Sequence, residues 1–494
     1  MGIGILVVTV DITSINVALP AIEKSFNIDL KTIEWIINGY LLAFAVLMVT
    51  CGRLADMYGR RKIFLIGLCL FGIASLIAGL SQSAGLLIAM RVLQGAAAAF
   101  LWPTIIGICY ASVSDSQKGL AIGIVMAVSG LGNAAGPLVG GFLTEYFSWR
   151  WVQFVNVPLA LLAGIITLMV VKEQDTEDGD QGIDYTGILL ISLSVISFLY
   201  ALDQSTVWGL FSLPTGGLIL LSFVLLYLFI KIEPRQLNAL IPPDVMKNKR
   251  FMTYCITIFT LVPTFFCLFL YVPQYLEKFK HYSPVQAGAG LVPMLITYGI
   301  IAPFTGKIFD KFGPRLTIFA GMLITAIGAY CIALFGFNND IIYLAISTSI
   351  SGVGIGLTIP AITTAGVGTV KDSRASLASG LIFMFQLCGA ALGLAIISTI
   401  FIDTAITDFS SRVSSLDLNL TSADINNVKS FLLGSSLENT IKADLGDSLF
   451  NKLIPHIRES YIKGLQFGIV FSGTLILVGA MINFIFTRDS SKQN

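Results

Sequence analysis

The chain has 494 residues, of which 55% are hydrophobic and only 12% are charged, and its formal net charge is +1. A mean hydropathy of +0.84 excludes a soluble domain of ordinary composition. The near-neutral charge gives no basis for a nucleic-acid partner. We therefore expect an all-α protein that is integral to a membrane.

Apolar runs long enough to cross a bilayer recur along the whole chain. A hydrocarbon core about 30 Å thick requires about 20 residues of helix. The first run contains Asp11 and lacks the basic start and small-residue cleavage site of a signal peptide, so we interpret it as a retained helix. We predict fourteen transmembrane helices, near 2–22, 35–55, 63–80, 85–109, 119–143, 152–171, 184–203, 213–231, 251–276, 284–306, 316–336, 341–362, 376–402 and 463–487.

A short polar loop after the second span recurs later in the chain. Residues 52–61 and 306–315 both follow the pattern G-[RK]-x-x-D-x-[YF]-G-x-R. Such an internal repeat is typical of transporters built from two related halves. We expect the aspartate of each loop to form a bond that is made in one conformation and broken in another, although the basic residues also suit a purely topogenic role. The candidate gating residues are Gly52, Asp56, Gly59, Arg60, Arg61, Asp310, Gly313 and Arg315.

The expected partners differ between the two loops. Asp56 can approach Arg60 or the N-terminus of a facing helix. Asp310 is expected to mirror it by pairing with Lys311 and Arg315.

The distribution of Lys and Arg indicates the orientation in the membrane. If the first helix begins inside, the inner segments hold 18 basic residues and the short outer loops hold only five. The positive-inside rule then places both termini in the cytoplasm of a plasma (inner) membrane protein.

Eight spans separate the two repeat loops, two more than twelve helices in two equal halves would give. We therefore predict a six-helix bundle in 1–171 and another in 251–494. Residues 172–250 would supply an acidic linker, an inserted two-helix hairpin and a basic connection.

The stretch 403–462 is a long outer loop with helical periodicity in 423–433 and 441–462. We expect an amphipathic hairpin on or over the outer mouth. The apolar residues spaced to share a face are Phe431, Leu432, Leu445, Leu449, Leu453 and Ile457.

The chain carries no motif for a cofactor or an enzyme active site. All seven cysteines fall within apolar spans, so neither disulfides nor a metal site is expected. The Walker, nucleophile-elbow and H-E-x-x-H patterns do not occur. We expect a non-enzymatic protein without cofactors, which would draw its energy from an ion gradient.

Two ionisable residues lie deep within predicted spans, and such residues are functional candidates because an intramembrane charge is costly. Asp11 is halfway along the first span, and its carboxyl group can take up and release a proton. Arg91, in the fourth span, keeps its proton but can hold a carboxylate or an anionic substrate. Gln94 and Asn16, one turn away, are placed to orient them. For both charged residues the alternative is a structural ion pair.

The fifth span contains a string of small residues that would make one helix face smooth and bendable. Such a helix can pack closely on its neighbour, with or without a bearing on transport direction. The residues of interest are Gly132, Gly136, Pro137, Gly140 and Gly141.

Together, the loop 52–61 and the strings 10–20, 87–96 and 130–141 resemble motifs A, D1, B and C of the fourteen-helix drug:proton antiporters of the major facilitator superfamily. The resemblance implies export of small amphiphilic molecules in exchange for protons by alternating access. It also implies a protein surrounded by membrane lipid that functions as a monomer, with a periplasmic adaptor in a Gram-negative cell. An exporter of an endogenous siderophore, lipid or metabolite and a nutrient symporter are the alternatives.

The tenth and thirteenth spans lack the additional acids of some members of that family. A lipophilic monocation, a neutral amphiphile or an anion facing Arg91 therefore fits better than a divalent cation. Aromatic and sulfur side chains suit an amphiphilic ligand, although ordinary packing explains many of them. The candidate cavity residues are Asn16, Gln94, Asn133, Phe265, Tyr271, Phe383, Met384 and Gln386.

Overall fold

The computed structural model describes the chain except for residues 29, 173–181, 237, 338–340, 415–427, 429–446 and 488–494. Its regular structure is helical throughout the described residues. The first part comprises α1 (Gly2–Phe26), α2 (Leu30–Tyr58), α3 (Arg60–Gly79), α4 (Ala84–Ala111), α5 (Lys118–Tyr146), α6 (Arg150–Phe154) and α7 (Asn156–Val170). The middle comprises α8 (Tyr185–Trp208), α9 (Leu213–Ile232) and α10 (Pro243–Met246). The last part comprises α11 (Lys249–Lys280), α12 (Pro284–Ala289), α13 (Val292–Cys331), α14 (Ile341–Val367), α15 (Ala375–Ser414) and α18 (Asp447–Phe486).

Thirteen helices in the described part of the chain are long and apolar enough to cross a membrane, where the sequence predicted fourteen. The difference arises at α13, which combines the predicted spans 284–306 and 316–336. Gly313 interrupts this helix with a non-helical backbone (φ 77°, ψ 165°). The equivalent glycine of the first repeat loop, Gly59, also has a positive φ of 98° and separates α2 from α3. The repeat therefore places a glycine at the same backbone break twice, because only glycine adopts this conformation without strain.

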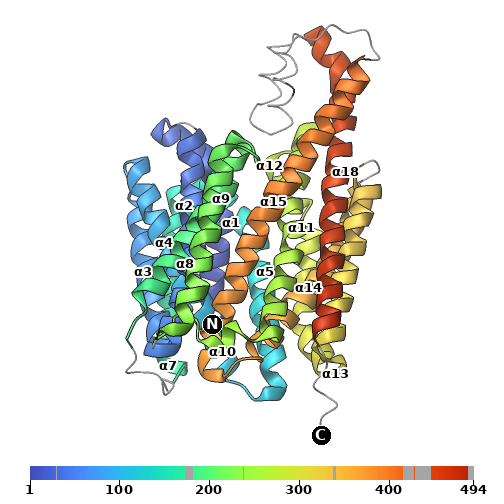
Figure 1. The fold of residues 1–494 in the computed structure, drawn as a ribbon. Helices are drawn as coiled ribbons and strands as arrows, with labels where there is room; N and C mark the ends of the chain where they lie inside the picture. The colour runs from blue at the N-terminus through green and yellow to red at the C-terminus, as the bar shows by residue number, and fades with distance from the viewer. Residues whose placement is uncertain are drawn as a thin grey trace.

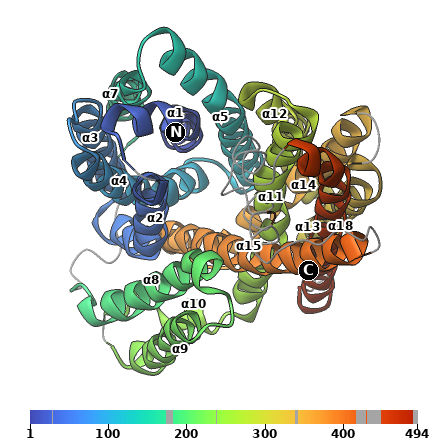
Figure 2. The same cartoon turned by 90° about the horizontal axis from the view of Figure 1, so that it is seen from above.

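Viewed along the helices, α1–α5 and α7 lie on one side of the molecule, and α11–α14 and α18 lie on the other (Figure 2). Helix α15 runs between the two groups, and it packs against α2 as well as α11 and α18. The hairpin of α8 and α9 lies at the periphery, where α8 contacts both α2 and α15. The helix pair α8–α9 thus covers the junction of α2 with α15 from outside.

Helices α15 and α18 extend well beyond the other helices at the upper end in Figure 1. Residues 447–462, predicted as part of a separate amphipathic hairpin, form the beginning of α18 instead. Leu453 and Ile457 are buried, and Leu449 packs against the same hydrophobic core, as the shared apolar face predicted. Phe431, Leu432 and Leu445 lie outside the described residues. We call the end at which α15 and α18 extend beyond the other helices the outer end. The opposite end, which holds the two repeat loops, is the inner end.

Helix α5 approaches two neighbours closely enough that side chains larger than hydrogen do not fit. On one face, a Cβ added at Gly132, Gly136 or Gly140 would lie 2.1, 1.8 or 2.4 Å from atoms of α1. On another face, a Cβ at Gly119 or Gly123 would lie 2.9 or 2.4 Å from the backbone of α13. The close packing predicted for the fifth span is present, and it joins α5 to α1 on one side and to α13 on the other. Pro137 and Gly141 lie on the same helix but are not among the glycines that approach α1 or α13 this closely.

The substitution Gly136→Ala tests this packing. Its Cβ would meet Thr13 Oγ1 at 1.8 Å and the backbone nitrogen of Ser14 at 3.1 Å. We expect a loss of stability of about 1–3 kcal/mol from overpacking, measured by thermal unfolding in detergent. The control is Gly141→Ala, whose Cβ would have its nearest neighbour at 3.7 Å. Equal melting temperatures for the two variants would contradict the close α1–α5 contact.

Candidate functional site

The two intramembrane charges predicted from the sequence form a direct ion pair. Asp11 of α1 and Arg91 of α4 meet with a distance of 2.5 Å between Oδ2 and a guanidinium nitrogen. Their side chains are 0% and 1% exposed. The other carboxylate oxygen, Oδ1, accepts a hydrogen bond of 2.8 Å from Asn156 Nδ2 of α7. The carboxylate is therefore held from two sides in a site without solvent contact.

Arg91 has several further partners that satisfy its charge. Its Nε donates to the carbonyl oxygen of Ile36 on α2 at 3.2 Å. The guanidinium nitrogen that contacts Asp11 also donates to Gln94 Oε1 at 2.9 Å. The guanidinium lies over the ring of Tyr40, 4.4 Å from its centroid. Arg91 is thus bound to α2 as well as to α1, as its planar fork of donors allows.

Gln94 extends the network to two further helices. Its Nε2 donates to Ser75 Oγ of α3 at 2.7 Å and to Gln153 Oε1 of α6 at 2.9 Å. Gln94, Gln153 and Ser75 are all fully buried. Six helices of the first half, α1–α4, α6 and α7, therefore contribute to one polar network, which we call the Asp11 network.

Of the two polar residues predicted to orient Asp11 and Arg91, only one contacts them. Gln94 contacts Arg91 as expected, whereas Asn16 is exposed and has no part in the Asp11 network. Sequence analysis did not assign roles to Asn156, Gln153 and Ser75. The available signal was their polar character in otherwise apolar spans, which does not by itself reveal which of them face Asp11.

A second buried ion pair lies at the inner end, in the first repeat loop. Arg60 Nε donates to Asp56 Oδ1 at 2.9 Å, and the two side chains are 7% and 1% exposed. The carboxylate also accepts hydrogen bonds from the backbone nitrogens of Ser376 and Leu377, at 3.2 and 2.8 Å. These two N–H groups belong to the first turn of α15, where unpaired N–H groups and the helix dipole favour an anion. Asp56 therefore binds both of the partners expected for it.

Arg60 strengthens this contact across the molecule. Its guanidinium nitrogens donate to the carbonyl oxygens of Gly107 on α4, at 3.2 Å, and of Asp372 just before α15, at 2.5 Å. Gly52 lies at the same junction, since a Cβ there would be 2.6 Å from the carbonyl oxygen of Ser376. We call the contacts of Asp56 and Arg60 with the start of α15 the inner lock. Arg61 is not part of it and donates instead to the carbonyl oxygen of Leu168 at 2.9 Å.

The second repeat loop does not form an equivalent lock. Asp310 is exposed, and the structure does not bring it to Lys311 or Arg315. Arg315 donates to the carbonyl oxygen of Phe484 on α18 at 2.7 Å and lies over its ring. The expected mirror image of the Asp56 interactions is therefore wrong, because Arg315 turns toward α18 and Asp310 toward the surface.

The candidate cavity residues lie on α1, α4, α5, α11 and α15. Phe383 of α15 packs on Trp102 of α4, with ring centroids 4.4 Å apart, and on Phe44 of α2. Tyr271 donates to Ser398 Oγ at 2.7 Å, and Phe265 packs on Phe269. Met384 is buried, and Asn133 and Gln386 are half-buried. The Phe44–Trp102–Phe383 cluster is the part that joins helices of both groups, at the seam of α2 and α4 with α15.

A family model described as Major Facilitator Superfamily matches residues 1–394. The puromycin resistance protein pur8 of Streptomyces alboniger is 31% identical over 402 residues, which cover 80% of this chain and 79% of that protein. The tetracenomycin C resistance and export protein of Streptomyces glaucescens is 28% identical over 400 residues, 81% of this chain and 74% of that one. The crystal structure of the human organic anion transporter MFSD10 shares the fold, with a TM-score of 0.63 at 12% identity over 98% of this chain and 97% of that one. The chain belongs to the major facilitator superfamily.

Proposed function

We propose that this chain is a proton-coupled antiporter that exports amphiphilic small molecules by alternating access. The observation that carries the proposal is the Asp11–Arg91 ion pair, a carboxylate and a permanent cation enclosed in the membrane-spanning part of the first half. An intramembrane carboxylate of this kind is the usual place for a transported proton. The family match and the relatives named for drug resistance and export support the direction.

The proposal includes fourteen crossings with both termini in the cytoplasm. The break at Gly313 divides α13 into two segments that each approach the length of a membrane span. Gly59 separates α2 from α3 in the same way, which supports two related six-helix halves, 1–171 and 251–494. The peripheral helices α8 and α9 then form the inserted hairpin.

Proton uptake at Asp11 would change the forces on three helices. The ionised carboxylate accepts bonds from Arg91 and Asn156 together, and protonation removes the Coulomb attraction to Arg91. Arg91 keeps its contacts with Ile36, Gln94 and Tyr40, so its charge remains satisfied on the α2 side. Helix α1 can then move relative to α2, and α5 moves with it because the glycines of α5 pack on α1. Because α5 also packs on α13, the change reaches the other half.

The substrate would bind at the seam between the two helix groups. The Phe44–Trp102–Phe383 cluster offers aromatic faces from α2, α4 and α15, and these helices part when the inner lock opens. Aromatic faces bind planar apolar groups and, through cation–π contact, a single positive charge. We therefore favour a neutral amphiphile or a lipophilic monocation as the exported molecule.

The substitution Asp11→Asn should abolish pH-driven antiport while ligand binding remains measurable. An amide is nearly isosteric with the carboxylate but does not cycle a proton. The measurement is uphill transport in proteoliposomes with an imposed pH gradient, with ligand binding as the check on folding. The matched control is Glu23→Gln, which neutralises an acid near the C-terminal end of α1. Native uphill transport by Asp11→Asn would show that another carboxyl group carries the proton.

The substitution Asp56→Asn should open the inner end. It removes the negative charge that binds the first turn of α15, and a hydrogen bond to a charged group contributes about 1.5–3 kcal/mol. At about 1.4 kcal/mol per factor of ten, the loss of one such bond raises the ratio of inner-open to inner-closed molecules by about 10- to 100-fold. Spin-label distances across the inner end measure this ratio.

The control for Asp56 is Asp310→Asn, at the same repeat position. Because Asp310 is exposed and lies apart from Lys311 and Arg315, its variant should keep the native distance distribution. An equal shift in both variants, or none in Asp56→Asn, would refute the inner lock as the state-determining contact.

A panel of compounds tests the direction and the substrate class. Inside-out membrane vesicles with an acidic interior should accumulate neutral amphiphiles and lipophilic monocations, and the collapse of the pH gradient should stop their uptake. Divalent cations of similar size should be poor substrates, because Asp11 is already paired with Arg91. Accumulation that requires an alkaline vesicle interior would identify a symporter instead.

A further inference from the structure

The peripheral hairpin brings two carboxyl groups together at the inner end. Asp184 precedes α8, and its Oδ1 caps this helix by accepting a hydrogen bond of 2.8 Å from the Gly187 backbone nitrogen. Glu233 follows α9, and its Oε1 accepts a hydrogen bond of 2.7 Å from the Ile241 backbone nitrogen. Glu233 is only 1% exposed. Each carboxyl group therefore has one oxygen held by a backbone N–H group and one oxygen remaining.

The two remaining oxygens face the same point. Asp184 Oδ2 and Glu233 Oε2 each lie 2.6 Å from the position of a Cβ on Gly187, so their separation is at most twice that distance. Both oxygens are buried, and neither has a hydrogen-bond partner among the described residues. Two ionised carboxylates in this position would repel each other at short range, and neither carries a hydrogen for the other to accept.

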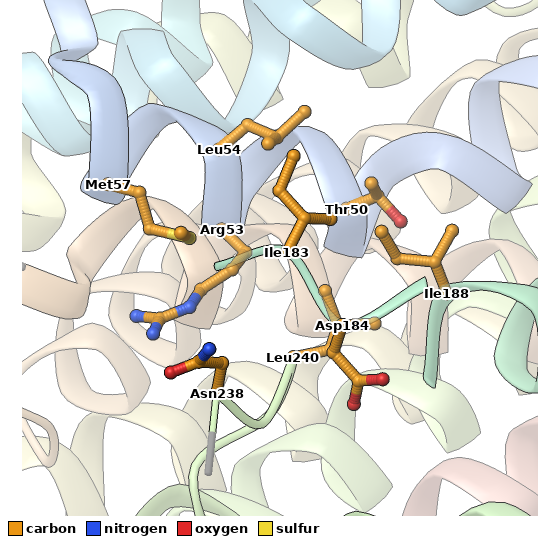
Figure 3. A pocket seen from close by; sticks show the side chains of 9 residues that line it. All are labelled: Thr50, Arg53, Leu54, Met57, Ile183, Asp184, Ile188, Asn238 and Leu240. Atoms are coloured by element: carbon orange, nitrogen blue, oxygen red, sulfur yellow. The ribbon is translucent and has the colours of Figure 1, made fainter. Parts of the chain in front are cut away.

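The charged groups on the surrounding helices do not neutralise this pair. Arg53 of α2 lines a small pocket together with Asp184, but the charged ends of the two side chains point to different sides of it (Figure 3). Lys231 and Arg235, on either side of Glu233, are exposed, and Lys231 lies over the ring of Tyr227.

The ion pairs described near the start of α15 do not include Asp184 or Glu233 either. They join Asp56 to Arg60, Lys118 to Asp372 and Arg374 to Asp244. Burial without a counter-ion among the described residues favours the neutral form of one of the two acids.

We propose that Asp184 and Glu233 form a proton-binding site that is separate from the Asp11 network, in which a single proton is shared by the two carboxyl groups. The proton resides on Glu233 Oε2, the more deeply buried group, and is donated to Asp184 Oδ2. Asp184 remains the anion because the Gly187 N–H group and the N-terminus of α8 stabilise its charge. The shared proton ties the beginning of α8 to the end of α9.

This site is in a position to act on the inner lock. The pocket that Asp184 lines also includes Thr50, Arg53 and Met57 of α2, on the same helical segment as Asp56. Thr50 Oγ1 is a further buried atom without a described hydrogen-bond partner. When the proton leaves, repulsion between the two carboxylates separates the ends of α8 and α9 and loosens the support of α2. The inner end thereby responds to the pH of the compartment that it faces, whatever the direction of transport.

Infrared spectroscopy of the full chain in lipid tests the shared proton. On going from mildly acidic to mildly alkaline buffer, the wild type should lose a carbonyl band of a protonated carboxylic acid. Glu233→Gln should lack this band, and the matched control Asp244→Asn, a neighbouring acid already paired with Arg374, should retain it. A band that persists in Glu233→Gln, or is absent from the wild type at acidic pH, would overturn the proposal.

Hydrogen exchange at the Ile241 amide gives a second readout. In alkaline buffer the wild type should exchange this amide several-fold faster than Glu233→Gln, because the glutamine amide donates to Asp184 at every pH. Equal rates would count against the shared proton. If Na⁺ or Ca²⁺ restores slow exchange to the alkaline wild type but not to Glu233→Gln, the site binds a metal cation and the proton proposal is wrong.

A steric variant provides an independent check. Gly187→Ala places a methyl group 2.6 Å from both oxygens and should separate the two carboxyl groups, removing the infrared band without removing either acid. The matched control is Gly216→Ala on α9, where no atom lies within 4 Å of the added Cβ. Retention of the band in Gly187→Ala would place the proton elsewhere.

Discussion

A charge enclosed in the membrane-spanning part of this protein has to be met by another protein group, because neither lipid nor bulk water reaches it. This constraint explains the arrangement of the described residues better than hydrophobic packing does, since apolar side chains face lipid and protein alike. Asp11 is met by Arg91 and Asn156, and Asp56 is met by Arg60 and the first turn of α15. The first arrangement lies within one half of the molecule. The second joins α2 to α15, so in the proposed transport cycle only the second has to break.

Helix α2 connects these two arrangements. Near its outer end, the Ile36 carbonyl and the Tyr40 ring contact Arg91, and near its inner end Asp56 contacts α15. A rigid helix transmits a small rotation along its length, so a change in the bonding of Arg91 reaches the inner lock without a chain of intermediate side chains. Helix α5 offers a second connection, since its glycines contact α1 on one face and α13 on another. The two connections leave Asp11 by different helices and reach different parts of the second half.

Sequence analysis predicted the features that depend on composition and local pattern. The apolar spans, the repeat, the close packing of the fifth span and the approach of Asp56 to Arg60 all follow from local spacing, whereas the sequence did not show which helix N-terminus Asp56 would meet. Contacts between distant segments did not follow. Asn16 was expected beside Asp11 but is exposed, whereas Asn156, 145 positions after Asp11, binds the carboxylate. The pairing of Asp184 with Glu233 was not predicted either, since it depends on how the two ends of the hairpin meet. The candidate cavity residues, selected by chemical type alone, are dispersed over several helices.

The comparison of the two repeat loops shows how far an internal repeat determines structure. Backbone geometry is reproduced, because Gly59 and Gly313 both adopt positive φ at the same position of the repeat. Electrostatics is not reproduced. The first loop has Arg60 after the glycine, and this side chain reaches back to Asp56; the second loop has Pro314 there, which supplies no donor, and Arg315 turns to Phe484. Because Pro314 replaces the arginine, Asp310 lacks the cation that pairs with Asp56 in the first loop. Of the two repeat loops only the first forms the inner lock, so we expect the alternating access proposed above to involve unequal forces at the two loops.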